Sequence, residues 1–399
     1  MEGESMSEWK EVKLGDYIEF NPYRKLRKGD KAKKITMDML IPHSKQIYDY
    51  IVEPYNGGAK FQNGDTIMAR ITPCLENGKH AYINILDKDE IAYGSTEYIV
   101  LCGKADVTDN EFVYYFSHSP IFKNTAIKSM VGSSGRQRAQ TDVLKDLVVN
   151  IPISVSEQKE IAGILSSLDA KIETNNKLNE KLEEMAQAIF KSWFVDFEPF
   201  KDKPFHETEL GMIPEGWEVG SLSDIATITM GQSPCGTSYN ENGEGIIFYQ
   251  GRTEFGFRFP SIRLYTTAPS RFAEVGSTLM SVRAPVGDIN MALLRCCIGR
   301  GVASIKSNCD CDSYIYYLMK SLKKRFDIYN GEGTVFGSVG RDTLRGMLIT
   351  IPPSSVISDF EMNISKIDSR IKTNELESQR LASLRDTLFP RLMSGELIV

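Results

Sequence analysis

Hydrophobic residues recur every three or four positions in two segments that lie about 200 residues apart in the chain. In the first segment this seam runs through Ile161, Leu165, Leu168, Ile172, Asn175, Leu182 and Ile189. In the second it runs through Ile364, Ile367, Ile371, Asn374, Leu381 and Leu388. Alternating steps of four and three are typical of a coiled-coil seam. The pattern predicts two long helices that pack on each other as an antiparallel coiled coil.

The two helical segments repeat each other, and the alignment pairs Asn175 with Asn374. A polar side chain in an apolar seam is costly unless it finds a partner, so we expect these two residues to pair and to fix the register. Ser156 and Ser358 precede the periodic stretches and are candidate N-caps.

The segments between the helices also repeat. Residues 64–73 (GDTIMARITP) match 276–285 (GSTLMSVRAP), and both read as strands. The aromatic stretches at 112–116 and 314–318 read as helices. A Gly-rich loop follows each of them, VGSSGRQRAQ at 131–140 and GEGTVFGSVGR at 331–341. Each globular segment is therefore predicted to be a mixed domain with a twisted sheet and few helices.

These patterns divide the chain into four parts. A first globular domain is expected over residues 1–155, a first spacer helix over 156–197, a linker and second globular domain over 198–354, and a second spacer helix over 355–399. The predicted fold class is α+β: two mixed α/β domains, separated by an antiparallel coiled coil of two long helices, with an internal pseudo-two-fold repeat. The first helix would span about 50 Å at the usual rise per residue.

The net charge is -6, from 47 basic and 53 acidic residues, which is unusual for a nucleic-acid binder. The positive charge is clustered, however. Seven basic residues fall within positions 24–34, and four more fall within 320–325. Such clusters can bind phosphate without a high overall isoelectric point. An ordinary solvated face is an equally open interpretation of either cluster.

Several classes of protein fit the sequence poorly. No run approaches the ~20 apolar residues of a membrane span, and the acidic N-terminus is unlike a signal peptide, so we expect a cytoplasmic protein. The seven Cys include no Cys-x-x-Cys motif, and only four His are present, which argues against a structural zinc site. The segment NPYR at 21–24 lacks the second proline and the Gly-rich turn of an amino-methyltransferase, and no P-loop is found. We expect no catalytic site on this chain.

Several motifs carry a resemblance to a known family: the helical segments SEQKEIAGILSSLDAKI and ISDFEMNISKIDSRI, the link WFVDFEPF…ELGMIPEGWEV, and MGQSPCGTSY, FYQG and LMSVRAPVGDI in the second domain. With these motifs the chain resembles, over nearly its whole length, the specificity subunit of type I restriction-modification enzymes. The resemblance implies two target recognition domains that each read one half of a bipartite sequence in double-stranded DNA. It also implies helices that dock two modification (methyltransferase) subunits and the restriction/translocase subunits. S-adenosylmethionine, ATP and Mg²⁺ would be bound by those partners and no cofactor by this chain.

The residues expected to contact DNA come from the basic cluster, the Gly-rich loops and the motifs of the resemblance. Arg and Gln can read guanine and adenine edges with two hydrogen bonds, and Ser and Thr suit phosphate. These candidates are Arg24, Lys25, Arg27, Lys28, Ser133, Ser134, Arg136, Gln137, Arg138, Gln140, Gln232, Ser233, Tyr239, Gln250, Arg252, Thr334, Ser338 and Arg341. For Arg70 and Arg283, near the repeated strand, a structural ion pair is the favoured interpretation.

Four aromatic residues at the end of the first helix, Phe190, Trp193, Phe194 and Phe197, are candidates for docking a modification subunit. Large apolar side chains on a solvated helix are typical of an interface. The alternative is that they close the coiled coil internally. For the whole chain, the alternative function is a coiled-coil scaffold whose globular domains bind protein rather than DNA.

Overall fold

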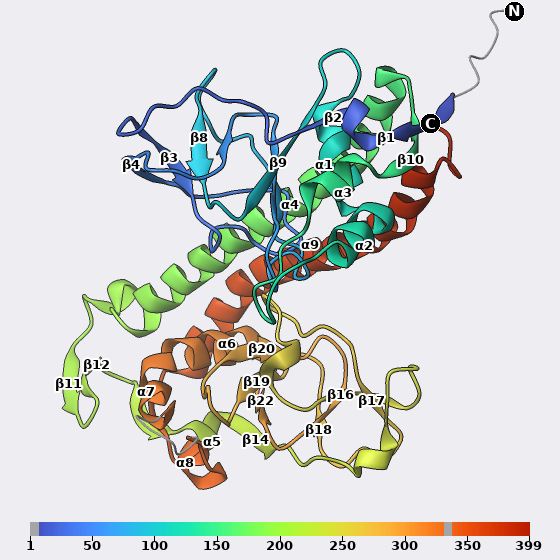
Figure 1. Ribbon diagram of the computed structural model, residues 1–399. Coiled ribbons are helices and arrows are strands. Elements are labelled where there is room, and N and C mark those ends of the chain that lie inside the picture. The colour runs from blue at the N-terminus through green and yellow to red at the C-terminus, as the bar shows by residue number, and fades with distance from the viewer. Residues whose placement is uncertain (1–7, 331–336) are drawn as a thin grey trace, which may run out of the picture. The chain divides into compact units, whose positions relative to one another are not determined.

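The computed structural model describes residues 8–330 and 337–399 (Figure 1). Contacts within the chain divide it into two compact units. Unit 1 comprises Met1–Thr174 together with Glu377–Val399, and unit 2 comprises Asn175–Leu376. Each unit therefore contains one globular domain and part of both long helices.

Unit 1 is built on two four-stranded sheets. Its strands are β1 (Trp9–Lys13), β2 (Ile18–Phe20), β3 (Lys31–Ile35), β4 (Ile51–Pro54), β5 (Lys60–Phe61), β6 (Thr66–Ala69), β7 (His80–Tyr82), β8 (Ala92–Gly94), β9 (Tyr98–Gly103) and β10 (Val148–Pro152). Its short helices are η1 (Leu14–Asp16), α1 (Asn110–His118), α2 (Pro120–Lys128) and α3 (Thr141–Lys145). The sheet orders are β2-β9-β6-β7 and β4-β3-β8-β5, and β1 pairs with β10. Only the β3–β8 pair is parallel among the pairings in the described part of unit 1.

Strand β6 is buried along its whole length because both faces of its sheet are covered. Met68 points into a core that includes α1, whereas Ile67 points into a second core shared with the β4-β3-β8-β5 sheet. Successive side chains of a strand face opposite sides, so a strand between two cores reads as a continuous apolar run. This burial explains the string TIMA that predicted the strand.

Unit 2 repeats this topology. Its strands are β11 (Phe205–Thr208), β12 (Gly211–Pro214), β13 (Glu218–Ser221), β14 (Ala226–Met230), β15 (Tyr239–Asn240), β16 (Ile246–Tyr249), β17 (Tyr265–Thr266), β18 (Phe272–Ala273), β19 (Thr278–Ser281), β20 (Ile289–Met291), β21 (Cys296–Ile298), β22 (Val302–Ser307) and β23 (Leu348–Ile351). Its short helices are η2 (Glu198–Phe200), α5 (Leu222–Ile225), η3 (Gly236–Ser238), η4 (Arg252–Glu254), α6 (Asp312–Ser321), α7 (Lys323–Asp327), η5 (Ile328–Asn330) and α8 (Arg341–Arg345).

The sheet order β14-β22-β19-β20 corresponds to β2-β9-β6-β7 of unit 1. The β13–β23 pair corresponds to β1–β10, and the parallel pair β16–β21 corresponds to β3–β8. Helix α6 lies against β19, β20 and β22, as α1 lies against β6, β7 and β9. The two globular segments therefore share one α+β topology.

The two long helices are α4 (Val155–Phe194) and α9 (Ser354–Ser394). Both begin one residue before the predicted segments and end earlier than predicted, and α9 continues through Pro390. The predicted N-caps were wrong. The Ser154 hydroxyl, rather than that of Ser156, accepts a hydrogen bond from the backbone of Glu157, and Ser358 lies inside the first turns of α9.

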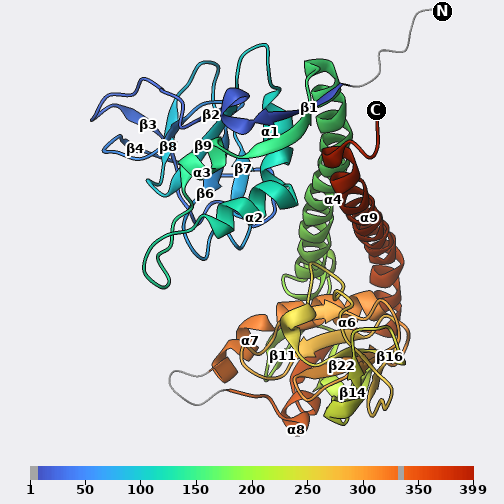
Figure 2. The ribbon, with the colours of Figure 1, turned by 45° about the vertical axis from the view of Figure 1, so that its right-hand side comes forward.

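Within each unit α4 and α9 run in opposite directions along each other. In unit 1, Arg385 of α9 contacts Asp169 at 2.8 Å and Glu377 contacts Lys171 at 3.3 Å. In unit 2, the amide of Asn179 donates to the carbonyl of Ile371 at 3.3 Å. Residue numbers therefore rise along α4 while those of the α9 partners fall (Figure 2).

Every residue of the predicted seam is buried or half-buried. The most deeply buried residues near the start of each helix pack into the domain cores. Ile161 and Leu165 join the core around α1, and Ile364 joins the core around α6. The expected Asn175–Asn374 pair differs in detail. The Asn374 side chain donates to Asn179 instead, and Asn175 reaches the backbone carbonyl of Asn374 at 3.5 Å.

Candidate nucleic-acid interface

A basic hollow of about 400 Å³ opens on unit 1 at the end of strand β6. Arg70, the first residue after the strand, lines it together with Arg24 and Lys60. Asn21 starts the loop that carries Arg24, and it adopts a left-handed conformation with φ 54°. Asparagine tolerates this conformation, and here its side chain accepts a hydrogen bond from the backbone of Val100 at 2.9 Å. The loop is thereby anchored to β9, an inner strand of the sheet.

The structure changes the interpretation of Arg24. Its guanidinium contacts the carboxylate of Asp65 at 2.8 Å, and the Asp65 side chain is only 1% exposed. Arg24 therefore neutralises a buried carboxylate. This structural role engages the guanidinium that was predicted to contact DNA. Lys25, Arg27 and Lys28 are exposed, as their predicted role requires.

The Gly-rich loop of unit 1 is closed at its base by a backbone bridge between Val131 and Arg138. The Arg138 guanidinium forks onto Glu97 at 2.9 and 2.7 Å, and the hydrogen bonds from Arg138 lower the pKa of that carboxyl. The Gln140 side chain donates to the carbonyl of Arg138. Arg138 and Gln140, which were predicted to contact DNA, therefore use their side chains to stabilise the loop. Ser133, Ser134 and Arg136 are exposed at its tip, with Gln137 half-buried behind them.

Unit 2 carries a similar hollow, of about 340 Å³, at the end of the equivalent strand β19. It brings together Ser233, Gln250 and Arg252, which were predicted to contact DNA, with Arg283, which was expected to form an ion pair, and Arg300, which was not predicted. Arg252 is paired with Asp288. Arg283 is exposed and makes no ion pair with any described residue, so the expected structural ion pair was wrong. Arg70 likewise donates to the carbonyl of Ala139 instead of a carboxylate.

The two hollows occupy the same place in the repeated topology. Each lies where strand β6 or β19 ends, just before a cis peptide bond at Pro73 or Pro285. Each is also lined by the connection that follows β2 or β14 and by the turn that follows β8 or β21. Three basic side chains line each hollow, but they come from different positions. Equivalent surfaces with different side chains can read different sequences.

The remaining candidates divide into exposed and structural residues. Gln232, Ser338 and Arg341 are exposed, and Ser338 bridges Arg283 through the backbone. Tyr239 is structural: its hydroxyl donates to the carbonyl of Pro234 at 3.0 Å and its ring packs on Phe248. Thr334 lies outside the described residues.

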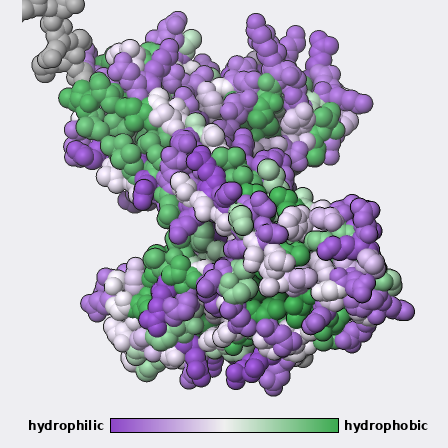
Figure 3. Space-filling view, turned by 180° about the vertical axis from the view of Figure 1, so that it is seen from behind, coloured by the Kyte–Doolittle hydropathy of each residue, from purple (hydrophilic) through white to green (hydrophobic). Residues whose placement is uncertain are grey.

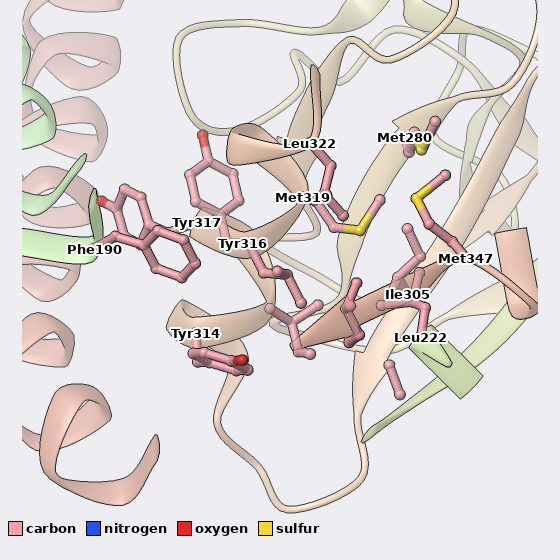
Figure 4. Close-up of a cluster of buried hydrophobic side chains, with 14 of the residues drawn as sticks. Phe190, Leu222, Met280, Ile305, Tyr314, Tyr316, Tyr317, Met319, Leu322 and Met347 are labelled. Atoms are coloured by element: carbon pink, nitrogen blue, oxygen red, sulfur yellow. The ribbon is translucent and has the colours of Figure 1, made fainter. Parts of the chain in front are cut away.

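The four aromatic residues predicted to dock a modification subunit lie in or against the core of unit 2. They do not form the solvated apolar surface on which that prediction was based. Phe190 and Phe194 are 3% and 9% exposed, and Trp193 and Phe197 pack against the same core. Figure 4 shows Phe190 in this core. Phe190 lies 5.9 Å from the ring of Tyr314, and Phe194 lies 5.9 Å from that of Trp217. The helix end thus closes the core of unit 2. Apolar residues on the face in Figure 3 form patches among hydrophilic ones.

The sequence offered weak signals for the lining residues that were missed. Arg300 stands between two glycines and Lys60 follows GGA, both of which indicate exposed turns. Among the described residues, no three His, Cys, Asp or Glu side chains are arranged to hold a metal ion. No helix of the described ranges combines the length and apolar character of a membrane span.

Comparison with known proteins places this geometry in a family. Residues 6–184 and 214–385 match the family described as "Type I restriction modification DNA specificity domain". The specificity subunit of the type I restriction enzyme MjaX of Methanocaldococcus jannaschii is 36% identical over 289 residues, which cover 71% of this chain and 66% of that protein. The HindI specificity subunit of Haemophilus influenzae is 24% identical over 98% of this chain and all of its own length.

A solved structure agrees with the fold. The type I restriction-modification S subunit from M. genitalium covers 98% of both chains with a TM-score of 0.61 at 14% identity. The family match spans most of the chain and includes both hollows. The chain therefore belongs to the family of type I restriction-modification DNA specificity domains.

Proposed function

We propose that this chain is the sequence-specific DNA recognition subunit of a type I restriction-modification complex, with each domain reading one half of a bipartite target. The observation that carries this proposal is the duplicated basic hollow, found at the same strand end in both family-matched domains. Basic side chains grouped on equivalent surfaces favour DNA over the alternative of a protein-binding scaffold.

The chemistry of the hollows suits this role. A guanidinium can donate two parallel hydrogen bonds to guanine in the major groove, and lysines bind phosphate as point charges. Arg283 and Arg300 are exposed and available for such contacts, as is Arg136 at the loop tip of unit 1. Because the charge is local, the net charge of -6 does not oppose binding.

The long helices are assigned the spacer role. We propose that α4 and α9 form an antiparallel coiled coil with an approximate internal two-fold, which sets the separation of the half-sites. The helices would also dock two modification subunits and, through them, the restriction subunits. S-adenosylmethionine, ATP and Mg²⁺ would be used by those partners. The opposite chain directions of α4 and α9 in each unit support this assignment.

A binding selection tests the proposal. The chain in complex with its modification subunit is incubated with randomised DNA duplexes, and the bound duplexes are sequenced. We expect two conserved blocks separated by a fixed gap. Arg136→Ala should relax one block, and the double variant Arg283→Ala/Arg300→Ala the other, by about 1–3 kcal/mol per lost base contact.

Arg345→Ala is the matched control, because Arg345 is exposed at the end of α8 and lies outside both hollows and both Gly-rich loops. It should leave both blocks unchanged. A wild-type complex that selects no motif, or arginine variants that weaken both blocks equally, would show that the loop tip of unit 1 and the hollow of unit 2 do not read separate half-sites.

A further inference from the structure

Each unit contains a buried cation in the connection between two paired strands of its second sheet. In unit 1 this cation is Lys45, between β3 and β4, and in unit 2 it is Arg258, between β16 and β17. Their side chains are 9% and 1% exposed. Their backbones are placed alike, because the carbonyl of Lys45 accepts from Tyr82 of β7 and that of Arg258 from Met291 of β20. The two residues are structural counterparts of different chemical type.

Each cation packs on a pair of adjacent tyrosines, and the two pairs occupy equivalent positions in the two units. Lys45 Nζ lies 5.5 and 4.9 Å from the ring centres of Tyr114 and Tyr115 in α1. The Arg258 guanidinium lies 4.1 and 5.3 Å from those of Tyr316 and Tyr317 in α6. A cation over an aromatic face is attracted more strongly when both groups are removed from water.

The second tyrosine of each pair continues the contact to a long helix. Lys45 donates to the hydroxyl of Tyr115 at 3.4 Å, and that hydroxyl donates to Asp169 of α4 at 2.7 Å. Arg258 donates to the hydroxyl of Tyr317 at 2.6 Å, and that hydroxyl donates to Asp368 of α9 at 3.0 Å. Burial raises the pKa of both tyrosines, so both hydroxyls stay protonated and can donate.

The bridge joins three layers of each unit: the second sheet, the short helix that covers the first sheet, and the long helix. In unit 2 it also involves Glu183 of α4, which pairs with both Arg258 and Lys320. Buried ion pairs add little net stability over apolar packing of the same volume, whereas an arrangement that leaves one charge unpaired is strongly disfavoured. Such a bridge therefore selects one orientation of the domain on its helix.

We infer that the cation–tyrosine–aspartate bridges fix the angle at which each domain is held on its long helix, and that Tyr115 and Tyr317 are positioning residues for the spacing of the DNA target. This inference rests on the proposed function. It adds that spacing depends on the buried bridges as well as on the length of the helices. Neither tyrosine lines either hollow, so their effect must act through the bridge.

The test uses Tyr317→Phe, which removes the hydroxyl bonded to both Arg258 and Asp368 and leaves the direct contact between these two residues, at 2.8 Å, in place. Tyr316→Phe is the matched control, since the Tyr316 hydroxyl is buried and has no hydrogen-bond partner among the described residues. Tyr115→Phe and Tyr114→Phe form the corresponding pair in unit 1. Each variant is measured as the complex with its modification subunit, on duplexes that carry the selected motif with the native gap or with one base pair more or less.

We expect the wild type and both controls to prefer the native gap. We measure this preference as the ratio of the dissociation constant for a duplex with an altered gap to that for the duplex with the native gap. In Tyr317→Phe and Tyr115→Phe the ratio should fall by about tenfold, which corresponds to one charge-assisted hydrogen bond of ~1.5 kcal/mol. Arg258→Lys, which keeps the charge but loses the fork, should give an intermediate ratio, and it decides the matter if Tyr317→Phe fails to fold.

An unchanged gap preference in variants with lowered melting temperatures would overturn the inference and leave the bridges a purely structural role. A wild-type complex without any gap preference would instead contradict the proposed function itself. The two failures are therefore distinguishable in one experiment.

Discussion

Asn374 of α9 donates its side-chain amide to the side-chain oxygen of Asn179 in α4 at 2.8 Å, and both residues are buried. An amide pair in an apolar helix interface admits one register, because a shift along the helix leaves both amides unpaired. The alignment of the repeat pointed to Asn175 as the partner of Asn374. The structure moves the pairing by one turn of α4.

Asn374→Ala should lower the free energy of unfolding by about 1–3 kcal/mol, since the buried side-chain oxygen of Asn179 loses its donor. Replacing both residues, as Asn179→Leu/Asn374→Leu, should restore or raise stability while weakening the preference for one register. Urea unfolding of the three proteins measures this. If the double variant is less stable than Asn374→Ala, the pair stabilises the helices beyond fixing their register.

Lengthening both long helices should change the accepted gap in the target. One heptad inserted after Thr174 and another after Leu376 leaves the contacts inside each unit intact, because the units meet there in sequence. The insertion adds about 10 Å of helix, or roughly three base pairs of DNA.

The lengthened protein should reject the original gap in a gap-length series. Insertion into α4 alone is the control, and it should disrupt pairing of the helices. A folded double-insertion protein that still prefers the original gap would show that the helices do not set the distance.

Arg24→Ala should destabilise unit 1 strongly, by about 3–5 kcal/mol, because it leaves the carboxylate of Asp65 buried without its cation. Lys25→Ala is the natural control, since Lys25 is exposed in the same loop and should change the melting temperature little. Thermal unfolding distinguishes them. Equal melting temperatures would mean that the Arg24–Asp65 pair contributes nothing to the fold.

Acid should destabilise unit 1 through two histidines in contact, the buried His80 and the half-buried His118, whose ring centres lie 4.6 Å apart. Burial, helped by the charges of His43, Lys123 and Arg385, lowers the pKa of His118 from 6.5 to about 3, and burial also lowers that of His80. The unfolded chain takes up these protons below about pH 6.5, whereas the folded chain does not. Stability is therefore fully present above pH 6.5 and is lost as the pH falls toward 3.

His118→Phe keeps a ring in the same apolar site and removes one of these protons. The decrease in unfolding midpoint between pH 7 and pH 4.5 should be smaller in this variant than in the wild type. Parallel pH profiles for the two proteins would exclude His118 as a source of acid sensitivity.

The elements that depend on local patterns could be predicted from the sequence. The seam of α4 and α9 and the apolar string of β6 follow from periodicity, because neighbours in sequence share one environment. The basic hollows were found only in part. Gln250 and Arg252 were singled out by a motif, whereas Arg283 was assigned to an ion pair that it does not form with any residue that the structure describes.

Contacts between distant residues could not be predicted. Asp65 lies 41 residues from Arg24, and no periodic pattern links them. The bridges were hidden for a further reason, since the cation is Lys45 in one unit and Arg258 in the other. The aromatic end of α4 was misjudged because an apolar residue on a helix looks the same in sequence whether a partner or its own domain covers it.

The most direct test of bipartite DNA recognition is a map of methylated adenines in cells that carry this chain and its modification subunit. The genome is sequenced with and without the gene for this chain. We expect one bipartite motif, two short blocks with a fixed gap, to be methylated only when the chain is present. Methylation of a single continuous block, or methylation that persists without the chain, would contradict the account.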